Sequence, residues 1–124
     1  MRVLELEVGA APHTIFGHVV WCGDDVIAII GGGTRSHVGA AALAEVRRSF
    51  SGDGSISSSA SVLSRLEHKD DLAARSAALY LSKYLQKTVV ATVGLHVDQA
   101  TAEDITILQS NLQLLLDKIV LQAQ

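Results

Sequence analysis

A glycine-rich segment followed by an arginine and a histidine is the first part of the sequence whose residue types could bind a ligand. Gly31, Gly32 and Gly33 are followed closely by Arg35 and His37. Glycines let backbone N–H groups converge on an anion, and an arginine can donate two hydrogen bonds to a phosphate. The segment has neither the dinucleotide-binding spacing nor that of a Walker loop. A glycine-rich hairpin turn is therefore the favoured explanation from these residues alone, with a phosphate site as the alternative.

Two further segments combine a histidine with charged neighbours. His68 and Lys69 precede a predicted helix, where helix-end N–H groups, an imidazole and an ammonium could face one negative group. A solvated, charged start of a helix is the commoner meaning of such a run. His96 and Asp98 stand two residues apart, which places both side chains on one side of an extended chain. They could orient one another, although a strand end followed by a helix cap is more common, and two ligands are too few to predict a zinc site.

Motifs for nucleophilic catalysis are missing from the sequence. It contains no G-x-S-x-G elbow and no HExxH, and Cys22 has no basic neighbour in sequence to activate its thiol. The serines from Ser55 to Ser61 are not paired with a base. We therefore predict a binding or helper protein rather than an enzyme, with no catalytic residue and no metal site. A small hydrolase or isomerase that uses His96 and Asp98 is the least favoured alternative.

Length and composition predict one domain over residues 1–124. The 124 residues are 48% hydrophobic and 19% charged, which is enough apolar surface to form a core. Thirteen acidic against ten basic residues give a net charge of −3, the wrong sign for a protein that binds nucleic acid. A single cysteine and a start without a long apolar segment predict the cytoplasm. The longest apolar run, residues 26–30, is far shorter than the roughly 20 residues that span a membrane, so we predict a buried strand there.

The elements that must position the candidate residues are strands in the first half of the chain. Residues 3–8 alternate apolar and acidic side chains, which is typical of a strand with one wet face. Residues 14–22 and the apolar run that ends at Gly31 are joined by a short turn, and together they predict a β-hairpin. Residues 38–46 and 56–63 predict two more strands, although the alanines of residues 38–46 are also compatible with a helix.

Two helices and one strand are predicted in the second half. Apolar side chains recur at helical spacing over residues 70–86, residues 88–93 form an apolar β-branched run, and a capping-box pattern from Thr101 to Asp104 begins a last helix. We therefore predict an α+β fold with the order βββββαβα. Its sheet has about six strands, is mainly antiparallel, and carries both helices on one face.

The last helix has two apolar faces. At 100° per residue one face carries Ile105, Leu108, Leu112, Leu115, Leu116 and Ile119, and the opposite face carries Ile107, Leu114 and Leu121. One face can cover the sheet, and the other is then available to a second subunit, which favours a homodimer. The alternative is that three isolated surface aliphatics need no partner.

Three ordered segments of the chain together resemble the small accessory subunit of gallate-type hydroxyarylic acid decarboxylases, a family that includes a prenylated-flavin chaperone. They are GGGTRSHVGA at residues 31–40, SASVL at 59–63 leading to HKDD at 68–71, and GLHVDQAT at 94–101. The likeness extends over most of the chain from about Val19 onward. The family pattern often has a proline before the first histidine, a glycine before HKD and an asparagine after HVD, where this chain has Ser36, Glu67 and Gln99.

The resemblance implies a fold similar to eukaryotic proteasome assembly chaperones, which are dimers. It also implies that the protein binds reduced prenylated FMN and delivers it to an apo-decarboxylase that depends on this cofactor. A protein-assembly chaperone without a small-molecule ligand is the alternative. The cofactor-binding residues that the resemblance implies are Gly32, Gly33, Arg35, His37, His68, Lys69, His96 and Asp98.

Overall fold

The computed structural model describes residues 1–48, 56–65 and 70–124, so the predicted site residues His68 and Lys69 lie outside the described part of the chain. The elements follow the predicted order βββββαβα. They are β1 (Val3–Val8), β2 (Ile15–Cys22), β3 (Asp25–Gly33), β4 (Ala40–Arg48), β5 (Ile56–Ser64), α1 (Asp71–Leu85), β6 (Val89–His96) and α2 (Ala102–Ala123).

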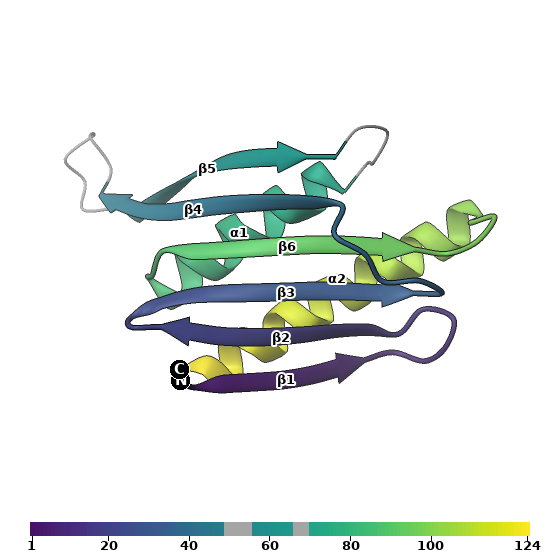
Figure 1. Ribbon diagram of the computed structural model, residues 1–124, viewed down its shortest axis with the longest axis horizontal. Helices are drawn as coiled ribbons and strands as arrows, with labels where there is room; N and C mark the ends of the chain where they lie inside the picture. The colour runs from purple at the N-terminus through teal and green to yellow at the C-terminus, as the bar shows by residue number, and fades with distance from the viewer. Residues whose placement is uncertain (49–55, 66–69) are drawn as a thin grey trace.

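The strands form one six-stranded sheet in the order β1-β2-β3-β6-β4-β5. Among the described strands, β3 pairs with β6 in parallel and the other four pairs are antiparallel. The predicted mainly antiparallel sheet is confirmed, and both helices lie behind it on one face (Figure 1). Because β6 is inserted between β3 and β4, the connection from β3 to β4 must cross the end of β6.

The core lies between the sheet and the helices, and strand alternation fills it. In β3 the side chains of Val26, Ala28 and Ile30 are buried. The alternating alanines of β4 are buried too, as are Ala74, Ala77 and Ala78 of α1. Small side chains on both elements let the helix approach the strand closely. This packing explains why the alanine-rich residues 40–44 form a strand, although alanine favours helices.

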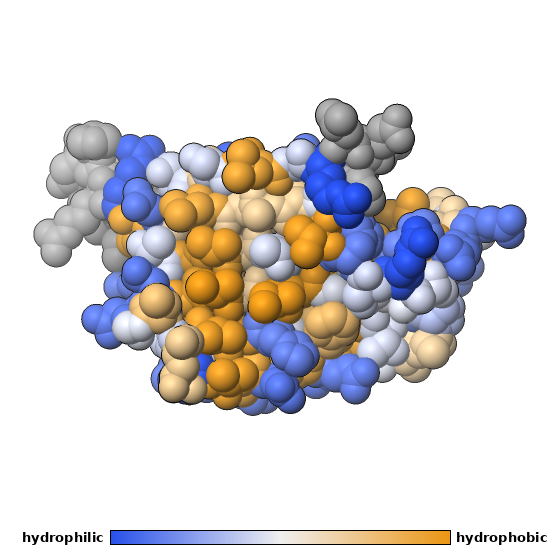
Figure 2. Space-filling model, viewed as in Figure 1, coloured by the Kyte–Doolittle hydropathy of each residue, from blue (hydrophilic) through white to orange (hydrophobic). Residues whose placement is uncertain are grey.

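The run at residues 26–30 forms the predicted buried strand, and the burial concerns one of its two faces. Ile27 is 37% exposed and Ile29 is 43% exposed. Both side chains point away from the helices, on the face of the sheet that neither helix covers. Figure 2 shows that hydrophobic side chains gather over the middle of this face.

The last helix begins at the predicted capping box, in which the Thr101 hydroxyl accepts from the Asp104 backbone N–H. Its predicted core face is confirmed for Leu108, Leu112, Leu115, Leu116 and Ile119, which are buried. Ile105, which belongs to the same predicted face, is exposed. Leu114 and Leu121 of the second face are exposed. No helix in the described ranges is long and apolar enough to cross a membrane.

Candidate functional site

The connection between β3 and β4 crosses the end of β6, and glycines make the crossing possible. A Cβ atom on Gly94 would lie 1.6 Å from the His37 carbonyl oxygen. A Cβ atom on Gly39 would lie 1.9 Å from Asp70 Oδ2. Neither position can accommodate a side chain unless the crossing segment moves. The backbone N–H of Thr34 donates to the His96 carbonyl at 2.7 Å, which fixes the start of the crossing to the end of β6.

Gly32 and Gly33 belong to β3 rather than to an open loop. A Cβ atom on Gly32 would lie 2.4 Å from the Thr14 carbonyl oxygen, and one on Gly33 would lie 2.0 Å from that of His96. Gly33 has a φ of 83°, which a side chain would strain. Its N–H donates to the Thr14 carbonyl at 2.9 Å. The sheet therefore already uses the Gly33 N–H, and cofactor binding by Gly32 and Gly33 stays a prediction.

Asp70 joins the three predicted segments. Its Oδ2 lies 3.1 Å from His37 Nε2, and its Oδ1 accepts from the Leu95 backbone N–H at 3.4 Å. Both carboxylate and imidazole are largely buried. Asp70 also precedes α1 but makes no side-chain cap bond to that helix. The carboxylate therefore orients His37 instead of satisfying the N–H groups of the first helical turn.

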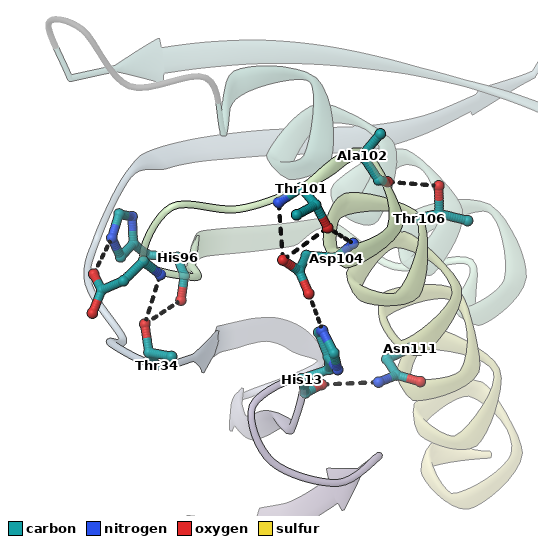
Figure 3. Close-up of polar contacts among 9 residues, drawn as sticks. His13, Thr34, His96, Thr101, Ala102, Asp104, Thr106 and Asn111 are labelled. Atoms are coloured by element: carbon teal, nitrogen blue, oxygen red, sulfur yellow. Dashed lines mark hydrogen bonds and ion pairs between the residues drawn. The ribbon is translucent and has the colours of Figure 1, made fainter.

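His96 and Asp98 form a second histidine–carboxylate pair, as their spacing predicted. His96 Nε2 lies 2.9 Å from Asp98 Oδ1. The Asp98 backbone N–H donates to the Thr34 hydroxyl, and this hydroxyl donates to the His96 carbonyl (Figure 3). The rings of His37 and His96 stand edge to face with centroids 6.5 Å apart. Two imidazoles, each held by its own carboxylate, thus lie side by side.

A third polar cluster fixes the first turn of α2. His13 Nε2 lies 2.7 Å from Asp104 Oδ1, and Asn111 Nδ2 donates to the His13 carbonyl at 2.8 Å (Figure 3). The backbone N–H of Thr101, together with the His13 side chain, lowers the pKa of Asp104. The cluster holds the β1–β2 connection against α2. It involves residues 91 positions apart in sequence, so no local pattern predicted it.

The elements enclose a cleft of about 910 Å³ between the end of β6, the first turn of α1 and the first half of α2. Its lining is half polar and half apolar. The polar lining consists of Arg35, His37, Arg65, Asp70, His96, Gln99 and Gln109. The apolar lining consists of Ala73, Leu95, Val97, Ala100, Ile105, Leu108 and Leu112.

The described lining of the cleft carries more positive than negative charge. It contains two guanidinium groups, those of Arg35 and Arg65, and one carboxylate, that of Asp70. Arg65 Nη1 donates to the Val38 carbonyl at 3.1 Å, which holds this side chain beside the crossing segment. The guanidinium of Arg35 has no hydrogen bond or ion pair in the part of the chain that the structure describes. Its donors are available to an anion in the cleft.

The structure brings most of the predicted residues together. Arg35, His37 and His96 line the cleft, Asp98 orients His96, and the two glycines allow close packing beneath them. The sequence interpretation missed Arg65, the orienting role of Asp70 and the wall that α2 contributes. Within the described ranges, no three His, Cys, Asp or Glu side chains are grouped so that they could hold a metal ion.

Comparisons with known proteins agree with the fold and with the family resemblance. The family model described as "prenylated flavin chaperone LpdD-like domain" matches residues 9–124. The search of curated proteins gives no significant match. A similar solved structure is a chain of a chaperone complex for yeast 20S proteasome assembly, with a TM-score of 0.53 and 15% identity over 92% of this chain and 94% of that one. At this identity the likeness concerns the fold alone.

Proposed function

The chain belongs to the family of LpdD-like prenylated flavin chaperone domains, and from this premise we propose that its cleft binds reduced prenylated FMN and delivers it to an apo-decarboxylase. The family is a chaperone family, so the chain is not an enzyme. One observation carries the proposal: three segments that are distant in sequence line a single cleft with two arginines and two oriented imidazoles.

The positive part of the cleft supports binding of the FMN phosphate. A phosphate monoester carries about −1.5 to −2 charges at neutral pH. Arg35 and Arg65 can each donate two hydrogen bonds to it, and the first turn of α1 lies beside them without a side-chain cap. We therefore assign the phosphate to the space between these arginines and the start of α1.

The oriented imidazoles and the apolar wall support binding of the flavin ring. Because Nε2 of His96 is bonded to Asp98, Nδ1 is the ring nitrogen that can meet the polar edge of the flavin. Leu108 and Leu112 provide an apolar surface for the ring system and its prenyl-derived part. A volume of about 910 Å³ lies within the range of pockets for ligands of this size. Exclusion of water by this wall slows side reactions of the reduced ring.

A carrier must also release its ligand, and the exposed polar contacts suit that task. The His96 side chain is about two-fifths exposed and Asp98 is mostly exposed. Contacts that water can reach contribute less affinity than desolvated ones, so release is faster. We also propose that the protein acts as a homodimer and that the dimer meets the apo-decarboxylase during transfer.

An anaerobic titration tests the binding step. The protein is titrated with reduced prenylated FMN and, in parallel, with ordinary FMN, while the ligand absorbance is followed. Saturation near one flavin per chain supports the proposal, and no spectral change at millimolar protein contradicts it. Trp21 is a poor reporter, because it pairs with Val26 at the far end of β3, about 23 Å from Gly33.

The matched variants are Arg35→Gln and Arg75→Gln. Arg75 is an exposed arginine of α1 that does not line the cleft. The phosphate assignment requires weaker binding only for Arg35→Gln. Equal affinity of both variants would contradict it.

A second candidate function is a protein-assembly chaperone without a flavin ligand. The uncovered apolar face of the sheet favours it, because such a face can grip a protein. Undetectable flavin binding, together with retained binding to an apo-decarboxylase, would support this alternative.

A further inference from the structure

Two glutamine side chains line the cleft without a bonding partner in the part of the chain that the structure describes. Gln99 lies in the connection from β6 to α2, and Gln109 lies on α2. Neither amide makes a hydrogen bond or an ion pair with any described residue. By contrast, Asn111 and Gln113 of the same helix both donate hydrogen bonds within the protein. The amides of Gln99 and Gln109 are therefore available to a ligand.

Gln99 has a backbone conformation that residues with a side chain rarely adopt. Its φ is 53°, in the left-handed region that favours glycine. The residue does not end a helix, because it lies between the end of β6 at His96 and the N-cap of α2 at Thr101. Residues held in this region are strained, and strained residues cluster at sites that hold ligands. A long amide side chain at this position therefore indicates a role in the cleft.

A primary amide is complementary to a ring edge on which an N–H group lies beside a carbonyl. The amide oxygen accepts hydrogen bonds and the amide nitrogen donates two, whereas a carboxylate only accepts and a guanidinium only donates. The pyrimidine edge of a flavin has this form, since its N3–H lies between two carbonyls. One amide can thus pair with N3–H and one carbonyl, and a second amide can donate to the other carbonyl.

The positions of the two amides suit one edge of a bound ring. Gln99 follows Asp98, which lies 2.9 Å from His96 Nε2, so the amide and this imidazole lie at the same end of β6. Gln109 lies about one helical turn after Ile105, which belongs to the apolar lining. A ring that packs on the apolar lining can therefore present its polar edge to both amides.

We propose that Gln99 and Gln109 form a subsite for a cyclic imide, in which Gln99 pairs with N3–H and one carbonyl of the flavin and Gln109 donates to the other carbonyl. This inference rests on the proposed function and adds the feature that selects the ligand. Arg35 can bind any phosphate monoester, so the phosphate end does not distinguish a flavin from other aromatic phosphates. Amides that would stay unpaired with a wrong ligand make that distinction.

A comparison of two ligands tests the pairing of Gln99 with N3–H. Reduced prenylated FMN and its N3-methyl derivative, which lacks the N3–H donor, are titrated anaerobically into the wild type and into Gln99→Gly. We expect N3-methylation to weaken binding to the wild type at least about tenfold. The same methylation should weaken binding to Gln99→Gly less than about twofold, because that variant has no amide to leave unpaired. An equal effect of methylation on both proteins would overturn the pairing.

Gln86→Gly is the matched control. Gln86 has a φ of 54° and lies at the C-terminus of α1, beyond the other end of β6 and outside the lining of the cleft. Both glycine variants relieve the same backbone strain, so both should keep or raise the urea midpoint of unfolding. Only Gln99→Gly should weaken binding of reduced prenylated FMN, by about tenfold. Equal affinity of the two glycine variants would overturn the role of Gln99.

Gln109→Met tests the second amide, because methionine keeps the length of the side chain and favours a helix. We expect this variant to bind reduced prenylated FMN about fivefold more weakly, and wild-type affinity would overturn the role of Gln109. The outcomes also separate the subsite from the proposed function. If the wild type binds no flavin at millimolar protein, both fail. If flavin binds and methylation has the same effect on the wild type and Gln99→Gly, the proposed function stands and the subsite alone is overturned.

Discussion

Gly94→Ala is expected to displace the crossing segment and thereby weaken the cleft. The added Cβ atom would lie 1.6 Å from the His37 carbonyl oxygen, whereas ordinary contacts begin near 3.4 Å. The carbonyl must therefore retreat by about 1.8 Å, which exceeds the tolerance of the 3.1 Å bond between His37 and Asp70. Overpacking costs about 1–3 kcal/mol, and loss of the hydrogen bond adds about 1 kcal/mol.

Urea unfolding and the anaerobic flavin titration measure the two consequences. We expect Gly94→Ala to lower the free energy of unfolding by about 2–4 kcal/mol and to weaken flavin binding at least about tenfold. Gly23→Ala is the control. Gly23 has a φ of 61° but no atom within 4 Å of its added Cβ, so the variant loses about 1 kcal/mol of stability and keeps its flavin affinity. A Gly94→Ala protein with wild-type stability and affinity would refute the role of the crossing.

Three further variants probe the cleft and its support. Asp70→Asn keeps the shape of the side chain but loses the charge that orients His37, so flavin affinity should fall about five- to tenfold. Asp71→Asn is the control, and an equal loss of flavin affinity in both variants would contradict the role of Asp70. Arg35→Gln should weaken binding of FMN about tenfold and leave riboflavin binding unchanged, because only FMN carries the phosphate; an equal loss for both ligands would contradict the assignment. Asp104→Asn tests the pH dependence of stability. The pKa of Asp104 is lowered in the folded state, so its carboxylate stabilises the fold above the unfolded pKa near 3.9. This contribution is lost as the pH falls through the lowered pKa. The stability difference between wild type and variant, measured by urea unfolding, should therefore shrink below about pH 4, whereas a constant difference between acidic and neutral pH would contradict this reasoning.

Local patterns were sufficient to predict the elements of the fold. Alternation identified the strands, helical spacing identified both helices, and the capping box at Thr101 was confirmed. At the cleft, β3 and β6 extend further than predicted, β3 to Gly33 and β6 to His96. Pairing of Gly33 with His96 in the parallel register explains both extensions, and such a contact between distant segments leaves no local signal.

The candidate site was only partly predictable for the same reason. Arg35, His37, His96 and Asp98 were identified as candidates from residue type and spacing, and only the family resemblance favoured them as cofactor-binding residues. The partner of His37 was not identified, because Asp70 lies 33 positions away in sequence. Asp70 reaches His37 only because β6 is inserted between β3 and β4. Arg65 carried no motif, and its place in the cleft depends on the pairing of β5 with β4.

The account depends most on the cleft being the place where the flavin is held. Nuclear magnetic resonance of the histidine side chains, recorded anaerobically with and without reduced prenylated FMN, tests this directly. We predict that the imidazole signals of His37 and His96 shift on binding, while those of His18, which lies on β2 away from the cleft, do not. Unchanged signals from His37 and His96 in a flavin-saturated sample would contradict the central claim.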